Sequence, residues 1–423
     1  MSKNVFAATV LFVLFAFSAV SSADEFTREN WSEKVGFKPD VAKVPFKTGE
    51  TVDAAGVGKA AGSLPEGVAM LVSKYGLKFQ VAPYVPVVPS DGYITATNSG
   101  AGKARLVDTG KKARERGLFD YSAGLPFPQP QNGLEIAWNY QYGYNGDDGD
   151  NLFQVYWVSA KNGVERHEDW RWMYIVRAMH RTDVEPIPAI PELADKEIQY
   201  SSLTTALAPF DKKGFTAMYN RFMEPKDQEG WIYIPSQRRA TRFSFGTRGD
   251  SWNNTDLLYE DVRGYMGYPE WMNWKLKEKK TMLAPVHAGI KISKSGADAV
   301  WDFKTAPYWN FKAKWEPRPF YVVEAIPKFA DYPYSKMVCY IDAETSYMMF
   351  KEAYDKKGQL WKVLVNVYNG SPDPTSQPPQ VAGALVVDVQ AEHATAFVWQ
   401  DAKANVGLKP DQFSLTQLRK LGR

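Results

Sequence analysis

The stretch MVCYIDAETSYMMFKEAYDKKGQLWKVLVNVY, residues 337–368, decides the fold class of this chain. It holds three apolar, β-branched and aromatic runs, separated by the short polar segments AETS and KKG. Such runs between turn residues are typical of strands, and turns this short join antiparallel neighbours. The stretch therefore predicts a three-stranded antiparallel meander. The period of two in its third strand predicts a dry face and a half-wet face, formed respectively by Trp361, Val363, Val365, Val367 and by Leu360, Lys362, Leu364, Asn366.

Further strand patterns lie on both sides of this meander. They cover residues 154–160, 170–179, 230–234, 320–325 and 380–389. Helical patterns are few: short helices are predicted at residues 66–74 and 256–262, and a last helix after Ser414, carrying Leu415, Leu418 and Leu421 on one stripe. We therefore expect a mainly β fold with a large curved antiparallel sheet and a few short helices.

The chain divides by composition into three parts. Residues 24–120 are rich in Gly and Pro and predict a loop-rich N-terminal arm. We expect this arm to pack on a β-dominated domain of residues 121–423. Residues 1–23 have a different pattern, that of a targeting segment.

This targeting segment has the features of a secretory signal peptide. Lys3 precedes an apolar run from Val5 to about Val20, and Ser21, Ser22 and Ala23 offer small residues for cleavage near Ala23. The alternative is an N-terminal membrane anchor, since the run approaches the ~20 residues that span a bilayer. Because no cysteine stands at the cleavage point, we expect an exported, periplasmic protein that is not lipidated.

Composition excludes several classes of function. The 51 basic and 48 acidic residues give a net charge of +3 without long runs of either sign, so nothing indicates binding to nucleic acid. The single cysteine, Cys339, excludes an intrachain disulfide framework. Its place in an apolar run predicts a buried small hydrophobe.

Catalytic and cofactor motifs are absent from the sequence. There is no G-x-S-x-G elbow, P-loop or dinucleotide-binding glycine turn. The four histidines (His167, His180, His287 and His393) do not stand at a metal-binding spacing. Residues 145–151, NGDDGDN, lack the register of a calcium loop and predict a hairpin turn. We expect no enzymatic activity, no cofactor and no metal site.

Aromatic residues are the unusual feature, with 14 Trp, 23 Tyr and 23 Phe. A concave sheet lined by such rings is a plausible cavity for a lipid or another hydrophobic compound, whereas for any single ring core packing is the alternative. The predicted lining residues are Trp231, Tyr233, Phe243, Phe245, Trp271, Trp274 and Trp361.

Three arginines, Arg238, Arg239 and Arg242, stand at one predicted hairpin edge. Guanidinium groups bind anionic head groups with two parallel hydrogen bonds, so these residues are candidates for contact with a head group or a partner. The alternative interpretation is solvated charges that protect a sheet edge from aggregation.

Four blocks together resemble a known family. They are GLPFPQPQNGLEIAWN (residues 124–139), WIYIPSQRRATRFSF (231–245), DLLYEDVRGYMGYPEWMNWKL (256–276) and VCYIDAETSYMMFKEAYDKKGQL (338–360). Their order, with the signal peptide and the length, resembles the Gram-negative domain-of-unknown-function family 1329. Tyr233, Pro235 and the arginine pair after them match its Tyr-x-Pro-x-x-Arg-Arg pattern, and Asp256 and Asp261 match its acidic positions.

The resemblance implies a fold and a class of function. The family is similar in fold to the Lol-type periplasmic lipoprotein carriers, half-open β-barrels whose aromatic-rich concave face lies under a helical lid. Its members are often encoded beside inner-membrane resistance-nodulation-division (RND) exporters and an outer-membrane protein. The resemblance therefore implies envelope transport of a lipid or other hydrophobic compound, with such proteins as partners. The missing lipidation cysteine favours a soluble shuttle over an anchored acceptor.

Two further hypotheses compete with a hydrophobe carrier. One is a non-enzymatic envelope assembly or interaction protein whose aromatic residues are all core, without a ligand cavity. The other is a hydrolase, which the lack of a catalytic constellation disfavours. A cavity of several hundred cubic ångströms would separate the carrier from the assembly protein.

Overall fold

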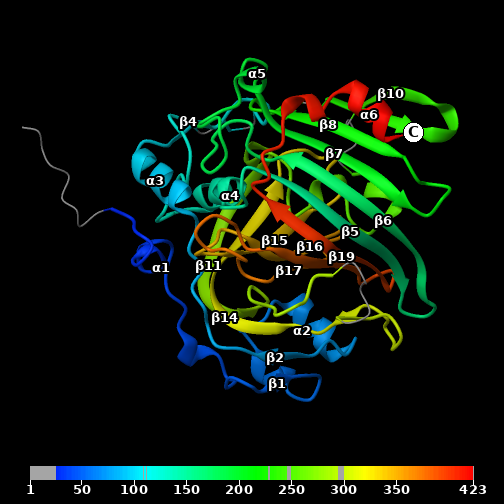
Figure 1. The fold of residues 1–423 in the computed structure, drawn as a ribbon. Helices are drawn as coiled ribbons and strands as arrows, with labels where there is room; N and C mark the ends of the chain where they lie inside the picture. The colour runs from blue at the N-terminus through cyan, green and yellow to red at the C-terminus, as the bar shows by residue number, and fades with distance from the viewer. Residues whose placement is uncertain are drawn as a thin grey trace, which may run out of the picture.

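The computed structural model describes residues 25–422 except 108, 111, 227, 228, 245–248 and 294–299. The expected signal peptide, residues 1–23, lies outside the described residues. Most of the described strand residues belong to one curved sheet of 15 strands (Figure 1). The mainly β fold class is therefore confirmed.

The sheet follows the order β1-β2-β14-β15-β16-β17-β18-β19-β5-β6-β7-β8-β9-β10, with β11 paired to β14. All neighbours are antiparallel except the parallel pair β2 and β14. Among the described residues no ladder joins β10 back to the other end, so the sheet remains half-open. The strands are β1 Thr51–Val52, β2 Phe79–Val81, β5 Asp148–Ser159, β6 Gly163–Ile175, β7 Ile198–Ala208, β8 Thr216–Phe222, β9 Glu229–Ile234, β10 Arg239–Ser244, β11 Met272–Ala284, β14 Lys314–Pro327, β15 Lys336–Asp342, β16 Met348–Tyr354, β17 Leu360–Tyr368, β18 Val381–Asp388 and β19 His393–Ala404.

Two short two-stranded ladders lie outside this sheet, β3–β4 and β12–β13. Their strands are β3 Arg105–Leu106, β4 Leu118–Phe119, β12 Trp301–Asp302 and β13 Asn310–Phe311. The described α-helices are all short: α1 Trp31–Lys34, α2 Glu66–Ser73, α3 Asp91–Gly100, α4 Gly133–Tyr142, α5 Pro191–Ala194 and α6 Leu415–Leu421. Within the described ranges, none of them has the length and apolar character needed to cross a membrane.

The predicted meander is confirmed as β15, β16 and β17, in which Cys339 pairs with Lys351 and Lys351 with Leu364. The placement of Trp361 on the face of Val363 was wrong. The register of β16 and β17 shifts beside Ala353, because Trp361 is the extra residue of a β-bulge. Its ring therefore turns to the opposite face and packs against Tyr334.

Both faces of the meander are covered. On one face α2 and the N-terminal strands pack on Val363, Val365 and Val367, which are fully buried. On the other face lie residues 252–266, hereafter the covering segment. The predicted half-wet face of β17 is consequently dry, with Leu364 2% and Asn366 5% exposed.

The predicted helices at residues 66–74 and after Ser414 are confirmed as α2 and α6, the latter capped by the Ser414 hydroxyl, which accepts from the amide of Gln417 at 3.2 Å. The helix predicted at residues 256–262 was wrong, since only a 3-10 turn, Tyr259–Asp261, forms there. The Asp261 carboxylate accepts from the amide of Leu258 at 3.0 Å, and Arg263 adopts a left-handed backbone conformation (φ 60°). The left-handed residue keeps this turn from continuing as a helix.

Two more expectations fail around Asp147 and Asp148. Residues 145–151 are not a hairpin turn, because β5 begins at Asp148. The buried Asp147 carboxylate accepts from the amides of residues 182–184, and that of Asp148 from residues 406–408. The strand predicted at residues 170–179 ends at Ile175, where the chain leaves the sheet toward Asp147.

A buried ion pair fastens the covering segment to the sheet. Lys351 on β16 pairs with Asp261, and both side chains are 2% exposed. Lys351 Nζ also donates to the carbonyl oxygen of Gly264 at 2.6 Å, and the Tyr334 hydroxyl donates to Asp261 at 2.6 Å. The charges of Lys351 and Asp261 are thus hydrogen-bonded as well as paired, as buried charges require.

We expect the substitution Lys351→Met to lower the free energy of unfolding by about 3–5 kcal/mol, because it leaves the Asp261 carboxylate buried without its counter-ion. Urea denaturation followed by tryptophan fluorescence measures this change. The matched control is Lys277→Met, since Lys277 is exposed and lies 3.9 Å from Glu324. The control should change stability by less than about 1 kcal/mol. An equally small loss for K351M would contradict a structural role for the pair.

Candidate functional site

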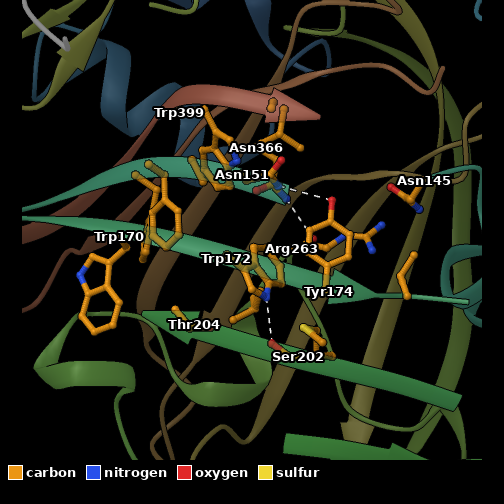
Figure 2. A pocket seen from close by; sticks show the side chains of 18 of the residues that line it. Asn145, Asn151, Trp170, Trp172, Tyr174, Ser202, Thr204, Arg263, Asn366 and Trp399 are labelled. Carbon is orange, nitrogen blue, oxygen red and sulfur yellow. Dashed lines mark hydrogen bonds between the residues drawn. The ribbon is translucent and has the colours of Figure 1, made fainter. Parts of the chain in front are cut away.

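A cavity of about 340 Å³ lies between the concave face of the sheet and the covering segment. Its walls come from β5–β9 and β17–β19, and the loop of residues 372–380 lines one side. Figure 2 shows side chains from several strands converging on this space. The volume falls within the range of about 300–1,000 Å³ that is usual for small-molecule sites.

Alternation along the strands sends every second side chain into the cavity. On β6 these are Trp170, Trp172 and Tyr174, and on β17 they are Leu364, Asn366 and Tyr368. The aromatic residues of the lining are Phe153, Trp170, Trp172, Tyr174, Tyr200, Phe215, Tyr219, Trp252, Tyr259, Trp271, Tyr368, Phe397 and Trp399.

One part of the cavity, hereafter the apolar end, is lined by a continuous hydrophobic cluster. Trp170 packs against Trp252 of the covering segment with ring centroids 5.2 Å apart, and Trp252 lies 5.9 Å from Phe397 of β19. Leu257 and Leu364 belong to the same cluster. Because these side chains offer no charge, this end suits a hydrocarbon chain or ring.

The opposite part, hereafter the polar end, carries amide, phenol and guanidinium groups. Asn151 Nδ2 donates to the Tyr174 hydroxyl at 3.4 Å, and Arg263 lies beside Tyr174 (Figure 2). Asn366 Nδ2 donates to the Arg263 carbonyl oxygen at 3.0 Å. Burial raises the pKa of Tyr174 and of Tyr368, so both phenols stay neutral at physiological pH.

The lining offers little for catalysis. Among the described lining residues there is no histidine or cysteine, and Ser202 accepts a hydrogen bond from Trp172 Nε1 at 2.9 Å rather than facing a base. Within the described ranges no group of three or more metal-ligating side chains lies together. Burial raises the pKa of Cys339, outside the cavity lining, to about 12.

A second polar contact ties the covering segment to the strands beneath it. His393 Nδ1 lies 2.7 Å from the Asp256 carboxylate, which also accepts from the Thr395 hydroxyl at 2.7 Å. The hydrogen bond to Asp256 raises the pKa of His393, and the Glu165 carboxylate 3.6 Å away acts in the same direction. The two acidic positions noted in the sequence, Asp256 and Asp261, thus attach the covering segment to the sheet at two points.

Of the predicted lining residues, Trp271 lines the cavity. Trp231 and Tyr233 pack with the cluster under α6, Trp274 packs against Tyr265, and Trp361 against Tyr334. The backbone of Phe243 lies in β10, and Phe245 lies outside the described residues. Ligand binding by these residues stays a prediction.

The predicted arginine hairpin joins β9 to β10 at the edge of the sheet. Arg238 occupies its turn with φ 49°, and Arg239 pairs with Ile234. Arg242 is exposed and lies 3.4 Å from Glu229. None of the three lines the cavity among its described residues.

The residues that build most of the cavity were not singled out from the sequence. The trio Trp170, Trp172 and Tyr174 falls within the strand predicted at residues 170–179, and its period of two was the available signal. No such pattern marks Arg263 and Asn366. These two residues meet because of the way in which the covering segment crosses the sheet.

Comparison with known proteins identifies the family. Residues 51–419 match the family described as protein of unknown function, DUF1329. The chain belongs to this family. The resemblance inferred from the four sequence blocks is therefore confirmed.

Relatives of this DUF1329 protein include an uncharacterized protein of Pseudomonas aeruginosa, 26% identical over 281 residues, which are 63% of this chain and 57% of that protein. The chain thus spans just over half the length of this curated relative. A crystal structure from Vibrio parahaemolyticus, described as an outer membrane lipoprotein-sorting protein domain, is similar with 17% identity and a TM-score of 0.48 over 68% of this chain and 98% of that one. The crystal structure of a DUF1329 family protein from Desulfovibrio piger is similar with 16% identity and a TM-score of 0.47. This match covers 68% of this chain and 97% of that one.

The contact between His393 and Asp256 predicts a pH dependence of stability. Folding raises the pKa of His393 above its unfolded value near 6.5. The contact therefore contributes fully to the free energy of unfolding below about pH 6.5, and this contribution is lost as the pH rises through the pKa of the folded state. The difference in melting temperature between wild type and His393→Gln should therefore be larger at pH 6 than at pH 9. The control His167→Gln changes an exposed histidine and should show no such increase. A difference for H393Q that is the same at both pH values would contradict the prediction.

Proposed function

We propose that this DUF1329 protein is a non-enzymatic periplasmic carrier that holds a lipid or other hydrophobic compound in the cavity. The observation that supports it most is the space of about 340 Å³ between the aromatic concave face and the covering segment. An assembly protein with a fully packed interior has no use for such a space. Exposing apolar lining to water is unfavourable, and a ligand would relieve that cost.

The size of the cavity limits the cargo. An engineered cavity of about 150 Å³ in another protein holds one benzene molecule, so 340 Å³ corresponds to on the order of a dozen carbon atoms. That is one acyl chain or a small ring system, rather than the several chains of a lipoprotein anchor. Removing a dozen methylene groups from water would contribute roughly 10 kcal/mol before the entropic costs of binding.

Delivery would need a partner, since nothing in the cavity releases a ligand by itself. An inner-membrane RND exporter and an outer-membrane protein suit this role. The exposed arginines of the β9–β10 hairpin are the proposed contact with such a partner or with an anionic head group. As part of this proposal, the signal peptide of residues 1–23 directs export of the chain to the periplasm.

Native mass spectrometry of the mature protein, purified from its own periplasm without detergent, tests the proposal. The wild type should carry an excess mass that organic solvent releases as a hydrophobic compound. A clean mass, together with no uptake of cis-parinaric acid, would contradict the carrier and favour the assembly protein.

Filling the cavity should abolish this excess mass. Ala217 of β8 lines the cavity and is half-buried, so Ala217→Trp places an indole where the cargo would lie. We expect A217W to lose most of the bound compound while it keeps its cooperative unfolding. The control Ala391→Trp adds the same ring at an exposed turn and should retain the cargo. Undiminished excess mass in A217W would show that the cargo binds elsewhere.

A further inference from the structure

A carrier of purely apolar cargo would not need the guanidinium of Arg263. It is half-buried, lines the polar end and comes from the covering segment (Figure 2). Among the described residues, Arg263 forms no ion pair with a carboxylate. The groups that surround it are instead the phenols of four tyrosines, Tyr140, Tyr174, Tyr347 and Tyr368. Burial opposes its charge, but a guanidinium stays protonated at every physiological pH.

The described lining also holds one carboxylate, Glu260, and one further cation, Lys403. The carboxylate of Glu260 acts on Tyr332 and Tyr334, whose pKa values it raises in addition to burial, and these tyrosines belong to the cluster around β15. Lys403 is exposed and pairs with Asp401 at 2.9 Å. Among the described lining residues, Arg263 is therefore the cation that is available to pair with an anionic ligand.

The backbone of Arg263 is held in place by its surroundings. Its left-handed conformation is unfavourable for a residue with a Cβ, by about 1–3 kcal/mol, and persists only where the structure enforces it. The Arg263 carbonyl oxygen accepts from the Tyr140 hydroxyl at 3.1 Å and from Asn366 Nδ2 at 3.0 Å. On either side, Asp261 and Gly264 are fixed by Lys351. The backbone of Arg263 is thus fixed before any ligand arrives, so that only the freedom of its side chain is lost on binding.

The cavity as a whole has the polarity of an amphiphile. Tyr174, Trp172 and Trp170 follow one another along β6 from the polar end to the apolar end, and Tyr368, Asn366 and Leu364 do the same along β17. A head group at Arg263 would place a hydrocarbon chain against Trp170, Trp252 and Phe397.

We propose that Arg263 binds the single anionic head group, carboxylate or phosphate, of a one-chain amphiphile whose tail fills the apolar end. This inference rests on the proposed carrier function and specifies its cargo. Arginine pairs with either group through charge-assisted hydrogen bonds, which become stronger in surroundings of low dielectric constant. A half-buried cation without a counter-ion is partly desolvated, and the ligand's charge would offset that cost.

Matched bromoalkyl probes test the inference. 11-Bromoundecanoate and 11-bromoundecanol differ only in the head group, and their bromine should quench the tryptophans of the apolar end. For the wild type at pH 8 we expect the carboxylate to bind at least about tenfold more tightly than the alcohol. Arg263→Gln should remove that preference and leave the affinity for the alcohol within about twofold. Undecyl phosphate should follow the carboxylate, whereas inorganic phosphate alone should not displace it.

The control variant is Arg105→Gln, which removes an exposed arginine 3.0 Å from Asp120, away from the cavity lining, and should keep the preference for the carboxylate. Arg263→Lys retains the charge and should retain part of the preference. Equal affinity of the wild type for both probes would overturn the inference while leaving the carrier function intact, and this outcome needs no variant to fold. Binding of neither probe would contradict the carrier function itself. Displacement by inorganic phosphate would assign Arg263 to a free anion instead of an amphiphile.

Discussion

The structure depends on the buried ion pair between Asp261 and Lys351. A concave sheet face lined with aromatic rings would otherwise be open to water, and the hydrophobic effect would close or aggregate it. The pair attaches the covering segment to the sheet at a fixed point, where Tyr334 and the Gly264 carbonyl oxygen complete the hydrogen bonding. The cavity therefore persists because its cover is held by directional polar contacts rather than by apolar packing alone.

Other buried charges also attach segments that are distant in sequence to one another. Arg318 of β14 is fully buried and pairs with Glu316, Asp342 and Glu344, and it also donates to the carbonyl oxygen of Val85 at 2.8 Å. Asp147 and Asp148 bind the amides of two loops that are distant in sequence. Because a charge in the interior tolerates few geometries, each such group fixes where a segment without regular structure crosses the sheet.

Prediction from sequence succeeded where a local pattern governs the structure. The three runs of residues 337–368 became β15–β17, and the stripe after Ser414 became α6, because alternation and capping are properties of neighbouring residues. It failed where distant groups compete with local preference. Residues 256–262 were predicted to form a helix, yet the carboxylate of Asp261 is held by Lys351 and Tyr334, and a 3-10 turn forms instead. Trp361 likewise left its expected face through a bulge that local alternation does not reveal.

The sequence by itself determined the mainly β class, the family and the abundance of aromatic side chains from which a cavity could be built. Only the tertiary structure decided which rings line that cavity and which are core. Trp170 and Trp231 are both strand residues of aromatic runs, but one faces the covering segment and the other the cluster under α6. Curvature of the sheet and the path of residues 252–266 select between them. These are long-range properties, set by contacts between residues 90 and 137 positions apart, and no local pattern encodes them.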